Sequence, residues 1–195
     1  MAFDRDQVYV PEADTYLMLD AARAEVKTGD RVLEIGTGSG TISADLVRMA
    51  NVVATDINPH AVFCARKKGV DVIQIDLFSG MRGTFDLVIF NPPYLPTQPE
   101  ERIDDWLEYA LDGGVSGRDV IGRFAEGIGE VLSPGGRILL LISSLTGLPE
   151  VRDLFSRQGF TSEIVLKKKV EDETLYVLKI VRIADKESRG SSVKP

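Results

Sequence analysis

The residues from Phe85 to Tyr94, FDLVIFNPPY, decide the fold of this chain. The first six form a short apolar run, which predicts a buried parallel strand. The two prolines that follow Asn91 cannot extend a strand ladder, because proline lacks an N–H and has a fixed φ. We therefore expect the chain to leave the sheet stiffly at Asn91. This places a polar amide at the carboxyl end of a central strand, where open α/β sheets bind ligands.

The rigid exit also has a chemical use. The amide oxygen of Asn91 and the carbonyl oxygen of Pro92 can be directed toward one point, and two fixed acceptors suit a planar –NH₂ group. Tyr94 could pack against the flat group. Asn91, Pro92, Pro93 and Tyr94 are therefore candidate substrate-binding residues, and Asn91, Pro92 and Tyr94 are candidate catalytic residues. The stretch alone fits a rigid turn without a ligand equally well, because Asn-Pro often marks turns.

Strand and helix patterns alternate along the chain on both sides of this strand. Alternation of this kind predicts a parallel sheet covered by helices on both faces, and the last two strands can form an antiparallel hairpin. The expected fold class is α/β, a doubly wound, mostly parallel seven-stranded sheet with one reversed strand at its C-terminal end. We expect strands over residues 31–35, 51–56, 71–75, 85–90, 137–142, 160–168 and 174–183, and helices over 13–27, 41–50, 59–68, 118–132 and 149–158.

The segments between these elements are also informative. Residues 97–117 are polar, contain Trp106 and form the longest irregular stretch; long loops in compact domains tend to be functional. Residues 133–136 are expected to form a turn. Residues 184–195 are polar and show no periodicity. We expect one domain over residues 1–183, followed by a disordered tail.

The composition limits the classes of function. The chain of 195 residues fits one domain with a substantial core. It shows no bilayer-spanning run and no signal segment, so we expect a cytoplasmic protein without membrane contact. One cysteine rules out an internal disulfide and a cysteine-rich zinc site, and we expect no metal. The lone histidine, His60, is expected at the surface. A net charge of −7 and a pI near 4.8 disfavour nucleic-acid binding.

A second motif, EIGTGSG at residues 34–40, joins the first strand to the next helix. Its glycines let the backbone approach a ligand closely. It resembles the dinucleotide fingerprint, but Thr41 stands where that pattern requires a third glycine. Asp56, at the end of the second strand, can accept both hydrogen bonds of a ribose diol. Asp76 ends the third strand, where it could meet an adenine amino group with Leu77 beside the ring.

Together, residues 34–40, Asp56, Asp76 and 91–94 resemble the successive motifs of class I S-adenosylmethionine-dependent methyltransferases. The Asn-Pro-Pro-Tyr form is typical of members that methylate an amino group conjugated to a π system, as in adenine, guanine or the glutamine side chain. The opening VYVPEADT and the later GGVSGR narrow the resemblance. They are similar to the HemK-like enzymes that methylate glutamine in translation release factors, in their short archaeal and eukaryotic type.

The resemblance implies S-adenosyl-L-methionine as the cofactor and a release factor, methylated in its Gly-Gly-Gln loop, as the protein substrate. The acceptor amide would lie between Asn91 and Pro92. Bacterial members carry a preceding helical domain, for which we expect no room here. Short members use a small zinc-binding activator subunit, which would form a heterodimer at an apolar edge near the third strand. The cofactor residues implied are Tyr9, Thr15, Glu34, Gly36, Gly38, Asp56, Asp76, Leu77 and Asn91.

Three alternatives remain open at this point. A nucleic-acid methyltransferase, acting on adenine N6 or guanine N2, would share the whole site, and only its docking surface would differ. A lysine methyltransferase would have to deprotonate a cationic acceptor, for which the site has no obvious base. A nucleotide-binding regulatory module would keep the cofactor pocket but would not need the acceptor residues 91–94.

Overall fold

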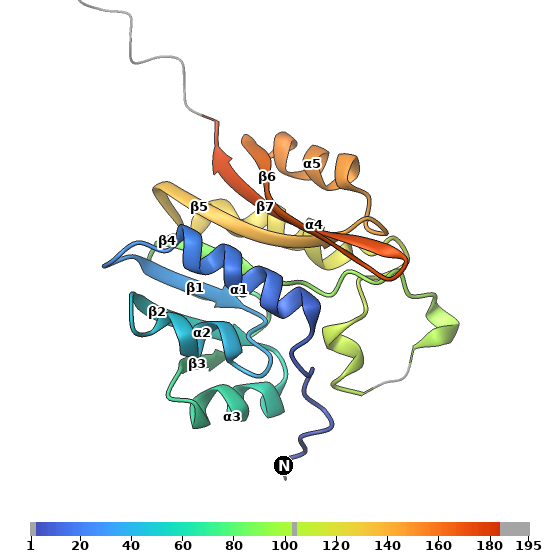
Figure 1. The fold of residues 1–195 in the computed structure, drawn as a ribbon, viewed down its shortest axis with the longest axis horizontal. Helices are drawn as coiled ribbons and strands as arrows, with labels where there is room; N and C mark the ends of the chain where they lie inside the picture. Colours follow the sequence, from blue (N-terminus) through green and yellow to red (C-terminus); the bar gives the residue numbers. More distant parts are fainter. Residues whose placement is uncertain (1–2, 103–104, 184–195) are drawn as a thin grey trace, which may run out of the picture.

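Strand β4 (Phe85–Phe90), which leads into Asn91, lies in the middle of a seven-stranded sheet. The computed structural model describes residues 3–102 and 105–183, and Figure 1 shows their arrangement. The strands lie in the order β3-β2-β1-β4-β5-β7-β6. The other strands are β1 (Arg31–Ile35), β2 (Asn51–Asp56), β3 (Asp71–Gln74), β5 (Leu132–Ser143), β6 (Phe160–Val170) and β7 (Glu173–Arg182).

Among the strands of the described residues, only β7 runs opposite to the others, near the edge of the sheet formed by the last part of the chain. Strands β1 to β5 pair in parallel, whereas β7 runs antiparallel to both β5 and β6. This confirms the expected doubly wound α/β sheet with one reversed strand. Strands β1 and β4 are neighbours, with Ile35 paired to Phe90. The glycine turn and the proline turn therefore leave the sheet side by side, at the point where the strand order changes direction.

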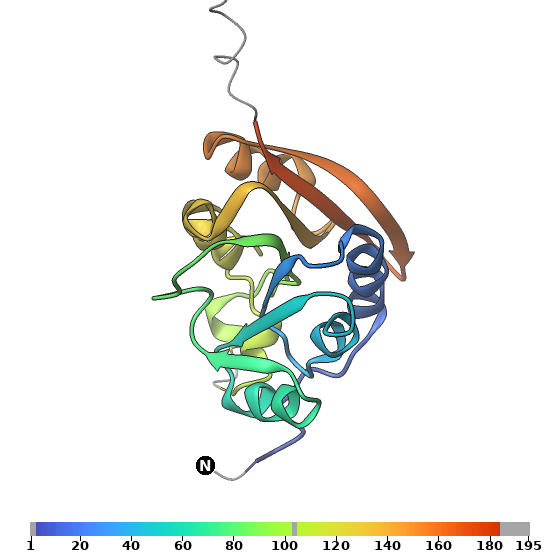
Figure 2. The same cartoon turned by 90° about the vertical axis from the view of Figure 1, so that its left-hand side faces the viewer.

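Helices cover both faces of the sheet. In Figure 2, α1 and α2, in blue and teal, are separated by the sheet from α4, in yellow; α5 lies on the same face as α4. Helix α3 packs beside α2 against β2 and β3. The α-helices of the described residues are α1 (Ala13–Glu25), α2 (Thr41–Leu46), α3 (Pro59–Lys67), α4 (Asp119–Gly127) and α5 (Leu148–Arg157), and the 3-10 helices are η1 (Pro99–Glu101), η2 (Glu108–Ala110) and η3 (Ile128–Glu130).

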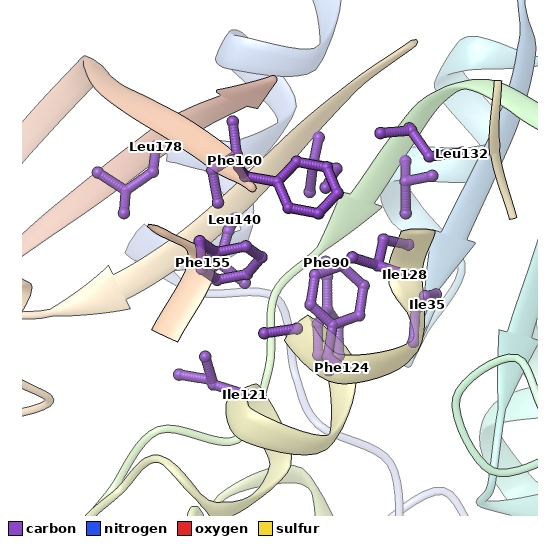
Figure 3. Packing of buried hydrophobic residues seen from close by; sticks show 14 of the residues in the cluster. Ile35, Phe90, Ile121, Phe124, Ile128, Leu132, Leu140, Phe155, Phe160 and Leu178 are labelled. Carbon is purple, nitrogen blue, oxygen red and sulfur yellow. The ribbon is translucent and has the colours of Figure 1, made fainter. Parts of the chain in front are cut away.

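Strand β4 is buried on both faces, because successive strand residues point to opposite sides of the sheet. Phe90 faces α4 and α5, where it packs among Phe124 and Phe155; the ring centroids of Phe90 and Phe124 lie 4.9 Å apart (Figure 3). Leu87 faces the other side and packs in a cluster with Met18 of α1. The strand that ends at Asn91 is therefore held from both sides.

The β4–β5 pair shows one incorrect prediction. Residues 133–136 do not form the expected turn between a helix and a strand, because β5 begins at Leu132 and includes them. Its pairing with β4 shifts between Phe85 and Leu87, and Gly135 has a φ of 76°. A glycine in this region lets a strand bulge without ending it. Proline and glycine at these positions therefore mark a bulge in β5, and the strand pairing continues across it.

Other boundaries moved by a few residues. Helix α2 ends at Leu46, four residues before the predicted end at residue 50. The β6–β7 hairpin has only Glu171 and Asp172 outside its strands: β6 runs on to Val170, beyond the expected end at residue 168, and β7 begins and ends one residue earlier than expected. The tail expected over residues 184–195 lies outside the described residues. Within the described part of the chain, no helix is long and apolar enough to cross a membrane.

The expectation of a surface position for His60 is wrong. Its side chain is 6% exposed, because the N-terminal segment crosses the start of α3. The backbone N–H of Asp4 donates to Nδ1 of His60 at 2.9 Å, and the rings of Phe3 and Phe63 lie 4.6 Å apart. The N-terminal segment carries no helix or strand pattern, so the sequence contains no signal for this packing.

Candidate active site

A cavity of about 910 Å³ opens at the carboxyl ends of β1 to β4. Its outer wall includes residues of the segment between β4 and α4 and one residue of the β6–β7 hairpin, Glu173; both segments lie at the right-hand side of Figure 1. The sequence predicted a site from several distant segments, and the structure brings all of those residues to this one cavity. The candidate residues that line it are Tyr9, Thr15, Glu34, Gly36, Gly38, Asp56, Asp76, Leu77, Asn91, Pro92, Pro93 and Tyr94.

The glycine turn between β1 and α2 forms the inner wall. Gly36, Gly38 and Gly40 have φ values of 63°, 53° and 74°, in the left-handed region where a Cβ atom is strained. Gly40 is also constrained by packing, since a Cβ there would stand 2.8 Å from the Cα atom of Ala65 in α3. The turn therefore exposes bare backbone to the cavity while it packs tightly behind.

The buried side chain of Glu34 holds this turn in place by hydrogen bonds. Its side chain is 3% exposed, and Oε2 accepts hydrogen bonds from Thr37 Oγ1 at 2.7 Å, from the Ser43 N–H at 3.0 Å and from Ser43 Oγ. Burial raises the pKa of Glu34 to about 7, and the hydrogen bonds from Ser43 and Thr37 oppose that rise. In this structure Glu34 ties the glycine turn to the start of α2.

Asp56 closes the other side of the turn. Its Oδ2 accepts from the N–H of Gly38 at 2.8 Å, and its Oδ1 accepts from the N–H of Asn58 at 2.9 Å. Burial raises the pKa of Asp56, and these backbone hydrogen bonds oppose the shift. Each carboxylate oxygen has a second lone pair. Asp56 can therefore hold the turn and still accept hydrogen bonds from a ligand diol.

The third strand end lies farther from the turn. Asp76 forms an ion pair with Arg123 of α4, so one of its oxygens is engaged within the chain. Leu77 has a φ of 51°, unusual for a residue with a side chain, and its carbonyl accepts from Thr55 Oγ1 at 2.8 Å. This hydrogen bond fixes the backbone that brings Leu77 to the cavity.

The amide of Asn91 is oriented by a carboxylate that the sequence did not single out. Its Nδ2 donates to Oδ2 of Asp14 at 2.8 Å. A carboxylate can only accept, so the –NH₂ side of the amide must face it. The other atom, Oδ1, is buried and has no hydrogen-bond partner among the described residues. A buried acceptor of this kind, in a residue that lines a cavity, is a place for a ligand N–H.

Two tyrosines stand beside this pair. The hydroxyl of Tyr9 donates to Oδ1 of Asp14 at 3.3 Å, and Thr15 Oγ1 donates to the same oxygen at 3.4 Å. Burial raises the pKa of Tyr9 and of Tyr94, and the negative charge of Asp14 adds to both shifts. Both phenols are therefore neutral and can donate hydrogen bonds.

The segment after Tyr94 is braced against the end of the long irregular stretch. Leu95 accepts from the N–H of Gly113 at 2.9 Å and donates to the carbonyl of Leu111 at 3.1 Å. Gly117, with a φ of 69°, packs so closely that a Cβ atom would stand 2.5 Å from the carbonyl oxygen of Tyr94. The proline turn is thus held by β4 on one side and by this loop on the other.

Sequence reasoning missed several residues of the cavity. Asp14 lies within the VYVPEADT stretch, but an acidic residue in the first turn of a helix is already explained by the helix dipole. Arg123 lies in α4, and nothing in its local sequence indicates a partner at the end of β3. Trp106, in contrast, belongs to the long irregular stretch that the sequence marked as functional; it lines the cavity, and its backbone N–H donates to Gln7 Oε1 at 2.9 Å. No group of three His, Cys, Asp or Glu residues in the described ranges could hold a metal ion.

Comparison with known proteins gives consistent matches. Residues 12–104 match the family model of the methyltransferase small domain. The chain is 39% identical, over 91% of its length and 93% of the relative, to a putative protein N5-glutamine methyltransferase of Methanocaldococcus jannaschii. It is 35% identical to the methyltransferase HEMK2 of Homo sapiens, over 90% of each chain.

One solved structure covers nearly the same length. It is the E. cuniculi Mtq2–Trm112 complex, described as responsible for the methylation of the eRF1 translation termination factor. A chain of that complex matches with a TM-score of 0.77 and 31% identity, over 91% of this chain and 99% of its own length.

Proposed function

This chain belongs to the HemK-like family of S-adenosylmethionine-dependent methyltransferases, and from that membership we propose that it methylates the glutamine side-chain amide of a translation release factor, in its Gly-Gly-Gln loop. The observation that carries the proposal is the orphaned, buried Oδ1 of Asn91, which lines the cavity beside the carboxyl ends of the strands. A neutral primary amide has the N–H donors that this acceptor lacks.

The cavity fits S-adenosyl-L-methionine, which supplies an electrophilic methyl group when it is bound. Gly36 and Gly38 present bare backbone, and Asp56 and Asp76 offer carboxylate acceptors at the next two strand ends. Tyr9 and Thr15, beside Asp14, would close over the methionine end. The residues proposed to hold the cofactor are Tyr9, Thr15, Glu34, Gly36, Gly38, Asp56, Asp76, Leu77 and Asn91.

Asn91 and its neighbours would act on the acceptor by position and polarity. The Oδ1 of Asn91 and the carbonyl of Pro92 each accept one N–H of the glutamine amide, while Pro93 and Tyr94 pack beside its plane. Accepting both hydrogens pushes electron density back onto a nitrogen whose lone pair is otherwise delocalised, and it aims that lone pair along one direction. Positioning and oriented dipoles of this kind are large sources of rate enhancement.

The charges around the cavity support a protein substrate over a nucleic acid. Two arginines line the cavity, and both are paired, Arg102 with Asp112 and Arg123 with Asp76. The basic run at residues 66–68 lies at the C-terminal end of α3, and the run at residues 167–169 lies on β6; none of their residues lines the cavity. Phosphate contacts dominate nucleic-acid affinity. In the described part of the chain, the cavity offers no unpaired cation for them.

The proposal includes a small activator subunit at the edge strand β3. The E. cuniculi relative forms a complex with Trm112. Strand β3 is one of the two outer strands of the sheet, and its Ile73 is 45% exposed. One edge carbonyl, that of Val72, accepts from the Arg66 side chain at 3.2 Å, a contact that an added strand could displace. An exposed apolar edge strand is a template for pairing; a zinc-binding subunit would cover it.

The deciding experiment is methyl transfer by the wild type and by Asn91→Ala, each with the activator subunit. Release factor and DNA are offered in parallel. The variant should lose about 10²–10³-fold in turnover on release factor, the scale for one preorganised hydrogen-bond partner. Its affinity for S-adenosylmethionine, measured by calorimetry, should change little, because all the other residues proposed to hold the cofactor are unchanged.

Asn51→Ala is the matched control, since Asn51 is exposed at the start of β2. It should keep full activity. Methyl transfer to adenine in DNA, with none to the glutamine of intact release factor, would overturn the proposed substrate. An Asn91→Ala protein that unfolds while the control stays folded would instead favour a structural role for the proline turn.

A further inference from the structure

The Asp14 carboxylate sits behind the amide that is proposed to hold the acceptor. It lies in the first turn of α1 and is 5% exposed. Its oxygens accept hydrogen bonds from three side chains: Asn91 Nδ2 at 2.8 Å, the Tyr9 hydroxyl at 3.3 Å and Thr15 Oγ1 at 3.4 Å. Such a buried carboxylate is held by donors on several sides and cannot easily turn away.

The side-chain amide of Asn91 has two orientations related by a half-turn. In one, Oδ1 faces the cavity and can accept a substrate N–H. In the other, the –NH₂ group faces the cavity, where it would oppose the N–H donors of the acceptor and place Oδ1 against the Asp14 carboxylate. A carboxylate repels that oxygen and accepts the –NH₂ group, so Asp14 selects the first orientation.

We propose that Asp14 is a positioning residue of the methyl-transfer reaction: it fixes the orientation of the Asn91 amide and strengthens its free oxygen as an acceptor. The strengthening follows because hydrogen bonds in a chain polarise one another, and here the chain begins with a negative charge. The inference rests on the proposed function, since it gives Asp14 a role only through Asn91. It requires no contact between Asp14 and the substrate.

A cycle of variants tests whether Asp14 acts through Asn91. Turnover on release factor is measured for the wild type, Asp14→Ala, Asn91→Ala and the double variant. Asp14→Ala should reduce turnover by about 10–100-fold, the scale for groups that orient a directly acting residue. The double variant should be no slower than Asn91→Ala alone, because the residue that Asp14 positions is already gone. If the two losses multiply instead, Asp14 acts independently of Asn91 and the inference is wrong.

An exchange of the two side chains keeps the inference testable even where Asp14→Ala folds poorly. Asn91→Asp alone places two carboxylates against each other and should be strongly impaired. Adding Asp14→Asn restores one N–H···O contact between the positions and leaves a carboxylate oxygen toward the cavity. Turnover should then recover at least about tenfold over Asn91→Asp. A purely structural or cofactor-binding role for Asp14 predicts no recovery, and its absence would overturn the inference.

Two further measurements distinguish a failure of the proposed function from a failure of the role given to Asp14. Cofactor affinity, measured by calorimetry for every variant, should stay within about threefold of the wild type, a shift small beside the expected loss of turnover. Asp20→Ala, an exposed position on the same helix, is the matched control and should keep wild-type turnover. A wild type that is inactive on release factor counts against the proposed function. An active wild type with multiplicative losses counts against the role of Asp14 alone.

Discussion

Glu34 makes the stability of the protein depend on pH. Its pKa is raised by burial from 4.5 to about 7, so the folded state favours the neutral acid. The corresponding stabilisation is fully present below pH 4.5 and is lost as the pH rises through 7. Glu34→Gln cannot ionise and should gain stability relative to the wild type between those limits. Denaturant unfolding of both proteins at several pH values from 4.5 to 8 measures this gain.

Glu163→Gln, at an exposed position of β6, controls for the loss of a carboxylate as such. A stability difference between Glu34→Gln and the wild type that is constant with pH would contradict the prediction.

At the residue scale, the sequence indicated which side chains would line the cavity but not what they would bind within the chain. Glu34 and Asp56 were expected to face a ligand, and both line the cavity. Both also hold backbone N–H groups of the glycine turn and its surroundings, which the sequence did not indicate. The apolar pattern of each strand predicts that these residues lie at the strand ends. Their hydrogen bonds depend on how the turns after β1 and β2 pack against each other, which the pattern does not show. Asp14 escaped prediction because its partner, Asn91, lies far away in the chain.

The loop that braces the proline turn is an element in its own right, and Gly117 is its closest contact. Gly117→Ala forces a side chain into a left-handed conformation, which costs about 1–2 kcal/mol. The new Cβ would also stand 2.5 Å from the Tyr94 carbonyl, so the proline turn must shift. We expect kcat/KM for release factor to fall more than cofactor affinity does, as measured by steady-state kinetics and calorimetry.

Gly122→Ala provides the contrast within the same region. Gly122 lies inside α4, and a Cβ there meets nothing within 4 Å. This variant should gain about 1 kcal/mol in helix stability and keep its activity. An equal loss of kcat/KM in both variants would show that the brace has no special effect on Tyr94.

At the element scale, the apolar strands and the periodic helices were predictable, whereas several of their boundaries were not. Strand β4 and strand β1 occur at the predicted residues, because a buried strand has a pattern that ends with its apolar run. The start of β5 was missed, because proline and glycines at residues 134–136 indicate a turn by every local rule. Pairing with β4 overrides that local preference, and a bulge absorbs the conflict.

The proposed heterodimer gives a test that involves the molecule as a whole. The sheet has two outer strands, β3 and β6, and each exposes one isoleucine at a comparable level: Ile73 at 45% and Ile164 at 38%. Ile73→Lys should prevent assembly with the activator subunit, because a lysine on an edge strand opposes pairing. Ile164→Lys should leave assembly intact. Size-exclusion chromatography of each variant co-expressed with the subunit measures this, and loss of the complex in both would refute the choice of edge.

The sequence did not show the order of the strands across the sheet. It did show that the residues at the carboxyl ends of the parallel strands would gather at one edge. Parallel strands joined by helices end at the same edge, so residues that follow them gather there whatever their separation in sequence. For this reason the sequence predicted the site residues that follow these strands as one group. It did not predict which residues form the outer wall of the cavity, because the polar residues between β4 and α4 have no periodicity that would indicate where they fold back.

Trp106 has a practical consequence. It is the only tryptophan in the chain, it lines the cavity, and its ring lies 5.3 Å from that of Tyr109. Nearly all of the intrinsic fluorescence excited at the red edge of the absorption band must therefore come from this one indole. A ligand that binds beside this indole or excludes water from it changes the wavelength and the intensity of its emission. Both cofactor and peptide can be titrated by light alone, without a label and without turnover.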